Sequence, residues 1–223
     1  MTPLATLRHS LAYSAEASSK ITAAYIDELG RNPDNLAGNQ AGLETVTPLA
    51  TLRHSLAYSV EASNKITAAY QDELGRNPDN LAGNQAGLET VTPLATLRHS
   101  LAYSAEASSA ITVAYQNLLD RNPDNLAGNQ TALESGTSLI SLRTTLANSS
   151  EAAGKIQAIF TGQGFQSLGP AITKEWQDVL VFNQKLSLIK QEAVYAKILA
   201  AYNPGDPLPP IGTPIGPFAV IGA

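Results

Sequence analysis

Residues 2–14 read TPLATLRHSLAYS, and the same thirteen letters return at residues 47–59 and 92–104. A diverged copy, TSLISLRTTLANS, follows at residues 137–149, so the spacing is 45 residues throughout. The first two periods differ only at the pairs Ala15/Val60, Ser19/Asn64 and Ile26/Gln71. Near-identity over a whole period indicates that one packing solution is used several times, as in a tandem repeat array.

Each period is predicted to form three short helices, which are easiest to follow in the second copy. Residues 66–75 (ITAAYQDELG) place Ile66 and Leu74 on one apolar stripe at helical spacing. The turn RNPD follows, and Asp79 is the predicted N-cap of a weaker second helix over residues 80–89. One 45-residue period buries too little surface to fold alone, so we expect the periods to stack on one another.

The third helix of each period begins at a Thr-Pro pair. Thr92 is its predicted N-cap, and Leu94, Leu97 and Leu101 form its apolar stripe at i, i+3 and i+7. Ser104 with Glu106 then starts the next unit, and the glutamate is favourably placed near a helix N-terminus. The predicted fold class is therefore all-α, with tandem three-helix repeats over residues 2–46, 47–91, 92–136 and, in part, 137–161.

After residue 161 the repeat pattern ends. Residues 170–203 contain no internal Gly and no Pro after the first position, which predicts one long amphipathic helix. Its expected apolar stripe consists of Ile172, Trp176, Val179, Phe182, Leu186, Ile189, Ala193, Ala196 and Leu199. Residues 204–223 are rich in Pro and Gly and are predicted to form an extended tail with an apolar end.

The composition disfavours several classes of function. Charged residues make up 15% of the chain and the net charge is −5, with no run of Lys or Arg that could cover phosphates or an anionic membrane surface. No segment has the roughly 20 apolar residues of a membrane span, and there is no cysteine. The first residues, MTPLATLRHSLAYSA, lack the pattern of a conventional signal peptide. We therefore expect no nucleic-acid partner and no membrane span.

No catalytic, cofactor or metal site is predicted. The sequence has no phosphate-binding Gly-rich motif and no nucleophile motif, and a group present in three copies does not suit a single active site. His9, His54 and His99 occur once per repeat without a second ligand at metal-binding spacing, so we interpret them as solvated or interfacial residues. Calcium at Asp79, Asn80, Asn84 and Glu89 is a weaker hypothesis, because the loop has a single carboxylate.

A family resemblance starts from YQNLLDRNPD at residues 115–124 and LESGTSLISLRTTLANSSEA at residues 133–152. These segments resemble a short bacterial helical repeat domain of unknown function found in S-layer-like and RTX-type secreted proteins, which is similar to the helical domain of phycobilisome linkers. The matching positions are Tyr25, Tyr70 and Tyr115, Arg31, Arg76 and Arg121, Asp34, Asp79 and Asp124, and Ser135, Gly136 and Leu139. The family's Trp is replaced by Asn39, Asn84 and Asn129. The resemblance covers residues 2–161 and implies a secreted or surface-associated module without a reaction.

The Arg and Asp of the RNPD turn form the predicted structural motif of the repeat. It comprises Arg31 and Asp34, Arg76 and Asp79, and Arg121 and Asp124. We expect the Arg to bond loop carbonyls and the Asp to cap a helix. The alternative is that the pair holds an anion or a sugar.

The first repeat suggests self-assembly. Leu4, Leu7 and Leu11 correspond to leucines that later repeats are expected to bury against a preceding neighbour, and the first repeat has no such neighbour. A second copy of the chain is the expected partner, through its C-terminal helix or its tail. The predicted interface residues are Leu4, Leu7, Leu11, Trp176, Phe218, Val220 and Ile221.

These patterns predict a non-enzymatic structural protein of the bacterial cell surface or extracellular matrix that polymerises into a filament or layer. Export would follow a non-classical or type I-like route. Two alternatives stay open: a secreted adhesion module that binds glycan or calcium, with Tyr58 and Tyr103 as exposed aromatic residues, and an intracellular linker scaffold.

Overall fold

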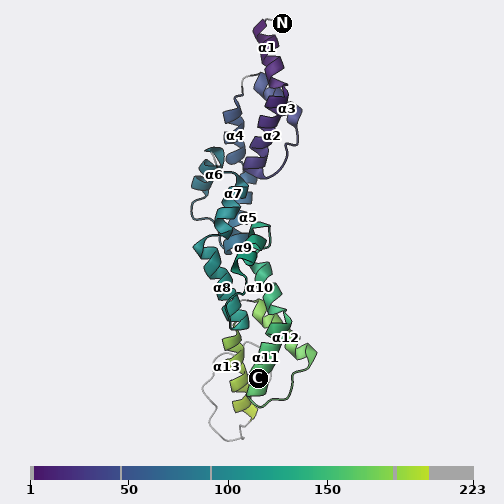
Figure 1. Cartoon of the computed structure of the whole chain (residues 1–223), viewed down its shortest axis with the longest axis vertical. Helices are drawn as coiled ribbons and strands as arrows, with labels where there is room; N and C mark the ends of the chain where they lie inside the picture. Colours follow the sequence, from purple (N-terminus) through teal and green to yellow (C-terminus); the bar gives the residue numbers. More distant parts are fainter. Residues whose placement is uncertain (1–2, 46, 91, 183–184, 201–223) are drawn as a thin grey trace. The chain divides into compact units, whose positions relative to one another are not determined.

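The computed structural model describes residues 3–45, 47–90, 92–182 and 185–200. Every regular element in these ranges is an α-helix, so the predicted all-α class is confirmed (Figure 1). The helices are α1 (Pro3–Ala12), α2 (Ala15–Leu29), α3 (Leu36–Glu44), α4 (Leu49–Ala57), α5 (Val60–Leu74), α6 (Leu81–Thr90), α7 (Leu94–Ala102), α8 (Ala105–Leu119), α9 (Leu126–Glu134), α10 (Leu139–Ala147), α11 (Ser150–Gly162), α12 (Pro170–Val181) and α13 (Leu186–Ala200).

The chain divides into two compact units. The N-terminal unit comprises residues 1–107 and 130–136, and the C-terminal unit comprises residues 108–129 and 137–223. The N-terminal unit therefore holds α1 to α7, the C-terminal unit holds α10 to α13, and α8 and α9 contribute residues to both.

In the N-terminal unit, each long helix begins after a serine and ends at a glycine. The Ser59 Oγ accepts a hydrogen bond from the backbone N–H of Ala62 at 3.0 Å, which starts α5 six residues earlier than the apolar stripe alone predicted. Gly75 has a φ of 70° in the left-handed region, and there it closes the helix. Ser14 and Gly30 bound α2 in the same way.

The shorter helices α3 and α6 are capped by asparagine. The Asn80 Oδ1 accepts a hydrogen bond from the Gly83 N–H at 2.9 Å, and Asn35 does the same for α3. The prediction that Asp79 caps α6 is therefore wrong, because α6 begins at Leu81 and Asn80 is the residue that directly precedes it.

The helices of the N-terminal unit pack through small and branched side chains. α4 packs against α2 and α7 packs against α5, while α3 and α6 lie against α2 and α5. The shared buried cluster contains Ala24, Leu29, Leu56, Ala57, Ala62, Ile66, Leu88 and Leu94. Alanines at the contacts let helix axes approach closely, so that a core of modest side chains is still well packed.

In the C-terminal unit, the prediction of one helix over residues 170–203 is wrong. α12 ends at Val181 and α13 begins at Leu186, and both helices pack against α11 (Figure 1). In a straight helix, Trp176 and Ala193 would be about 25 Å apart at 1.5 Å per residue. The chain reversal instead places both in a single buried cluster. Residues 201–203 and the predicted tail lie outside the described residues.

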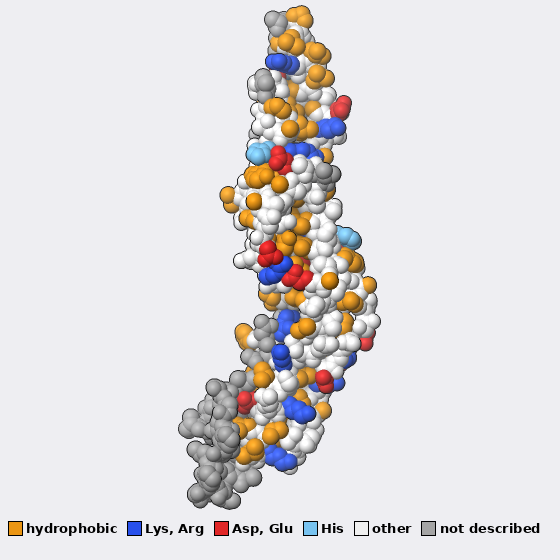
Figure 2. Space-filling view, turned by 90° about the vertical axis from the view of Figure 1, so that its left-hand side faces the viewer, with side chains coloured by type: hydrophobic (Ala, Val, Ile, Leu, Met, Phe, Trp, Pro, Cys, Tyr) orange, Lys and Arg blue, Asp and Glu red, His pale blue; other side chains and the backbone are white. Residues whose placement is uncertain are grey.

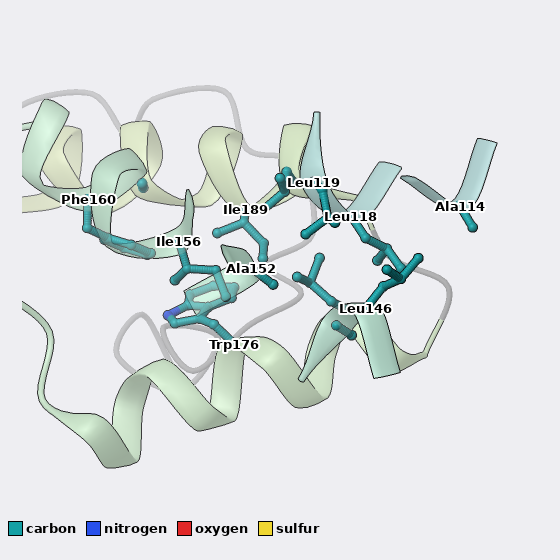
Figure 3. Close-up of a cluster of buried hydrophobic side chains, with 13 residues drawn as sticks. Ala114, Leu118, Leu119, Leu146, Ala152, Ile156, Phe160, Trp176 and Ile189 are labelled. Carbon is teal, nitrogen blue, oxygen red and sulfur yellow. The ribbon is translucent and has the colours of Figure 1, made fainter. Parts of the chain in front are cut away.

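Trp176 is at the centre of this cluster. Its side chain is fully buried, and its ring centroid lies 5.5 Å from that of Phe160 (Figure 3). Ile156 of α11 and Ile189 of α13 belong to the same cluster (Figure 3). Trp176 is therefore a core residue of the C-terminal unit, and its full burial does not fit its predicted place in an assembly interface.

Candidate functional site

The most unusual surface of the N-terminal unit is the exposed side of α1. Leu4, Leu7 and Leu11 are 58%, 55% and 62% exposed. Hydrophobic side chains gather at the top of the space-filling view, where α1 lies (Figure 2). We call Leu4, Leu7, Leu11 and the neighbouring Arg8 the leading face.

The same residues are covered in later copies of this helix. Leu94 and Leu101 of α7, which correspond to Leu4 and Leu11, are 6% and 8% exposed. The cause is that α7 packs on α5 and α4 packs on α2, whereas in the described part of the chain no long helix precedes α1. Leucines of identical sequence context are thus buried in α7 and exposed to solvent in α1.

The arginine next to these leucines also has acidic partners in the second and third copies but not in the first. Arg53 of α4 donates to Asp27 at 2.8 Å and to Glu28 at 3.1 Å, both on α2. Arg98 of α7 pairs with the equivalent acids of α5. Arg8 has neither an ion pair nor a side-chain hydrogen bond with any described residue. The leading face therefore lacks an acidic partner as well as an apolar one.

A groove lies beside the leading face. It has a volume of about 340 Å³, and Arg8, Leu11, Leu43 and Glu44 are among the residues that line it. The Glu44 Oε1 also lies 3.2 Å from the Nδ1 of His9. The groove thus brings a cation, an anion and apolar surface together at one place.

The histidines have a common setting. His9, His54 and His99 each lie 3.0–3.2 Å from a glutamate of the following short helix, namely Glu44, Glu89 and Glu134. Each imidazole also packs on the tyrosine four residues later at 4.6 Å between ring centroids. These contacts are polar bridges between neighbouring helices.

The arginine of the RNPD turn joins consecutive repeats. Arg76 binds both carboxylate oxygens of Glu106 at 2.5 and 2.8 Å, the carboxylate of Asp79 at 2.8 Å and the carbonyl of Asn77 at 3.0 Å. The guanidinium lies over the Tyr70 ring at 5.4 Å. Arg31 with Glu61 and Arg121 with Glu151 repeat the bidentate pair.

The glutamate partner was not identified from the sequence, although it recurs 30 residues after each arginine. The bond to arginine holds the pKa of Glu61, Glu106 and Glu151 below the ordinary range of a glutamate. Asp34, Asp79 and Asp124 are bound to the arginine of their own turn. The motif is thus a set of ion pairs between elements.

Replacing Arg76 with Met is expected to lower the free energy of unfolding of the N-terminal unit slightly, because the pair is bidentate but partly exposed to solvent. Urea denaturation at low salt and at about 1 M salt measures the effect, which screening should reduce. Asp79→Asn is the matched control, since it leaves the bond to Glu106 in place. Equal losses in both variants would argue against a joint between repeats.

Two other glutamates are enclosed. Glu28 and Glu73 are fully buried, and burial raises the pKa of each from 4.5 to about 7 although Arg53 or Arg98 lowers it. The remaining charged neighbours are Asp27 and Glu89 for Glu28, and Asp72 and Glu134 for Glu73. These carboxyl groups make the helix contacts sensitive to pH.

The residues considered for calcium have protein partners. Asp79 is bound to Arg76, Asn80 caps α6, and Glu89 contacts His54. The Asn84 Nδ2 lies 3.3 Å from the Tyr70 hydroxyl. In the part of the chain that the structure describes, no three His, Cys, Asp or Glu side chains cluster in a way that could hold a metal ion.

Comparison with protein-family models, curated proteins and solved structures gives no match for the chain. Among the described helices, none combines the length and the hydropathy needed to cross a membrane. Phe218, Val220 and Ile221, which were predicted interface residues, lie outside the described residues.

Proposed function

We propose that this chain is a non-enzymatic structural protein that joins to another copy of itself through the leading face. The observation that carries the proposal is the contrast between exposed Leu4 and Leu11 and their buried copies Leu94 and Leu101. Burying a leucine contributes about 1.5–3 kcal/mol, so covering three of them favours association clearly. The repeat is, in this proposal, a 45-residue module of three helices that serves as a spacer.

A second copy is the favoured partner because the surface carries both halves of a complementary pair. Arg8 and Glu44 line the same groove beside Leu11. In the proposed two-fold pair the same patch of both copies meets, so the cation of one copy can face the anion of the other. α2 and α5 already pack against α4 and α7 within the same chain, and α12 and α13 already cover α11. Pairing of two leading faces uses only the open surface.

Light scattering on the full chain tests this proposal. We expect a mass above the 23.4 kDa of one chain, and a return to 23.4 kDa in the double variant Leu7→Glu, Leu11→Glu. Val60→Glu is the matched control, since Val60 is 77% exposed on α5 and lies away from the leading face in sequence. A monomeric wild type at high concentration, or a double variant that associates like wild type, would contradict the proposal.

We further propose a location at the bacterial cell surface or in the extracellular matrix, on the basis of the resemblance to repeats of S-layer-like and RTX-type proteins. A filament or layer requires a second joint, for which the apolar tail residues Phe218, Val220 and Ile221 are the candidates. Detection of the chain only in the cytosol of expressing cells would argue against this location.

A further inference from the structure

A cleft in the C-terminal unit has the size and polarity of a small-molecule site. Its volume is about 600 Å³, and it lies between the end of α8, the second half of α11 and the beginning of α13. Gln116, Asn117, Asp120, Lys155, Lys185 and Lys190 supply most of its polar groups. Ile159 and Leu186 supply apolar surface. Pockets of this volume with a few convergent polar groups are typical of ligand sites.

The cleft is positive in a chain that is negative overall. It gathers three of the seven lysines against one carboxylate, while the net charge of the chain is −5. Lys185 and Lys190 are exposed and form no ion pair or hydrogen bond with any described residue. Lys155 is half-buried and close enough to Glu151 to influence it, although that glutamate is already bound by Arg121. Two lysines are therefore available to an anion.

The repeats provide an internal comparison for this cleft. Asn117 and Leu118 stand where the first two repeats have Asp-Glu, at 27–28 and 72–73. The third repeat thus lacks both carboxylates, and Asn117 lines the cleft, whereas Leu118 is buried in the core. Arg143 corresponds to Arg53 and Arg98, which bind those acids, and its Nη2 is buried without a hydrogen-bond partner among the described residues.

The backbone differs at the same place. Asp120 replaces the glycine that closes the long helix in the first two repeats, and its φ of 53° lies in the left-handed region that favours glycine. Asp is one of the few residues with a side chain that are enriched in this conformation, so it can replace the glycine here. The replacement places a carboxylate in the lining of the lysine-containing cleft.

We propose that this cleft binds an anionic sugar. Lys185, which directly precedes α13, and Lys190, in the second turn of α13, bind the carboxylate or phosphate of the ligand. Asp120 would repel a simple polyanion but accepts hydrogen bonds from hydroxyl groups, which the amides of Gln116 and Asn117 can also bind. The apolar face of a sugar ring suits Ile159.

Calorimetry on the full chain tests the site with four probes: glucuronate, glucose 6-phosphate, glucose and inorganic phosphate. We expect at least one anionic sugar to bind, and glucose and inorganic phosphate to bind about tenfold more weakly or worse, since each lacks one set of contacts. Binding of glucuronate alone would identify a carboxylate ligand, and binding of glucose 6-phosphate alone a phosphate ligand. Failure of both, or equal binding of inorganic phosphate, would overturn the proposal.

Variants separate this site from nonspecific attraction. Lys185→Ala with Lys190→Ala should weaken binding about tenfold or more, as loss of two charge-assisted bonds predicts. Lys65→Ala is the matched control, because Lys65 is the repeat equivalent of Lys155 outside the cleft, and it should leave binding unchanged. Asp120→Gly should retain phosphate binding but lose the preference for the sugar. Unchanged affinity in the double lysine variant, with unaltered circular dichroism, would refute the assignment.

Discussion

Replacing Trp176 with alanine is expected to lower the free energy of unfolding of the C-terminal unit by about 3–5 kcal/mol. Trp176 is fully buried against Phe160, and it links α12 to the core of α11 (Figure 3). Its removal leaves a cavity that the surrounding helices fill only in part. The same substitution would also weaken the packing that keeps α12 beside α11.

Phe182→Ala is the matched control, since Phe182 is 77% exposed in the turn that follows α12. Urea denaturation followed by circular dichroism is the suitable measurement, because Trp176 is the only tryptophan and its loss removes the fluorescence signal. If Trp176→Ala destabilised the protein no more than Phe182→Ala, the core of the C-terminal unit would have to be elsewhere.

The second large effect concerns Glu73 and pH. The pKa of Glu73 is about 7 in the folded chain and 4.5 as the ordinary value, so the folded state holds an extra proton between these two values. The contribution of Glu73 to the free energy of unfolding is therefore fully present below pH 4.5 and is lost as the pH rises toward 7. A shift of this size corresponds to roughly 3 kcal/mol.

Glu73→Gln should therefore remove this fall in stability and make the protein more stable than wild type above pH 7. Thermal unfolding at several pH values between 4.5 and 8 measures the slope, and Glu28→Gln should act in the same direction. Glu16→Gln, at an exposed carboxyl group near the start of α2, is the control and should preserve the slope. A wild-type stability that increases from pH 5 to pH 8 would contradict the burial argument.

Local sequence patterns predicted the helical class, but they placed the start of the long helix of the second period at Ile66, six residues after the observed start at Val60. They did not predict the chain reversal after Val181, because residues 171–203 contain neither Pro nor Gly. The reversal depends on tertiary packing, in which α12 and α13 both bury apolar side chains on α11. Helix propensity is weak enough for such packing to override it.

The candidate sites also divide into features that the sequence predicts and features that depend on tertiary contacts. Comparison of the repeats predicted that the leucines of the first copy are exposed, and Leu4, Leu7 and Leu11 of α1 are exposed in the structure. The glutamate of each Arg–Glu pair is 30 residues from its arginine, and the lysine cleft combines residues from three helices. Contacts over such distances along the chain require the folded arrangement. A periodic search for acids at fixed offsets from each arginine would have found Glu106 but not the cleft.

The identity of α1, α4 and α7 over the nine residues LATLRHSLA affects how the chain reaches its fold. When α7 docks on α2 in place of α4, the misaligned pairing buries the same side chains as the native one. The connection to α4 from the end of α2 is about 20 residues and that to α7 about 65, and this difference in loop closure favours the native order by only about 1 kcal/mol. Correct alignment during folding therefore gains from parts of the chain that are not repeated, such as the contact between Phe160 of α11 and Trp176 of α12, which has no counterpart elsewhere in the described chain.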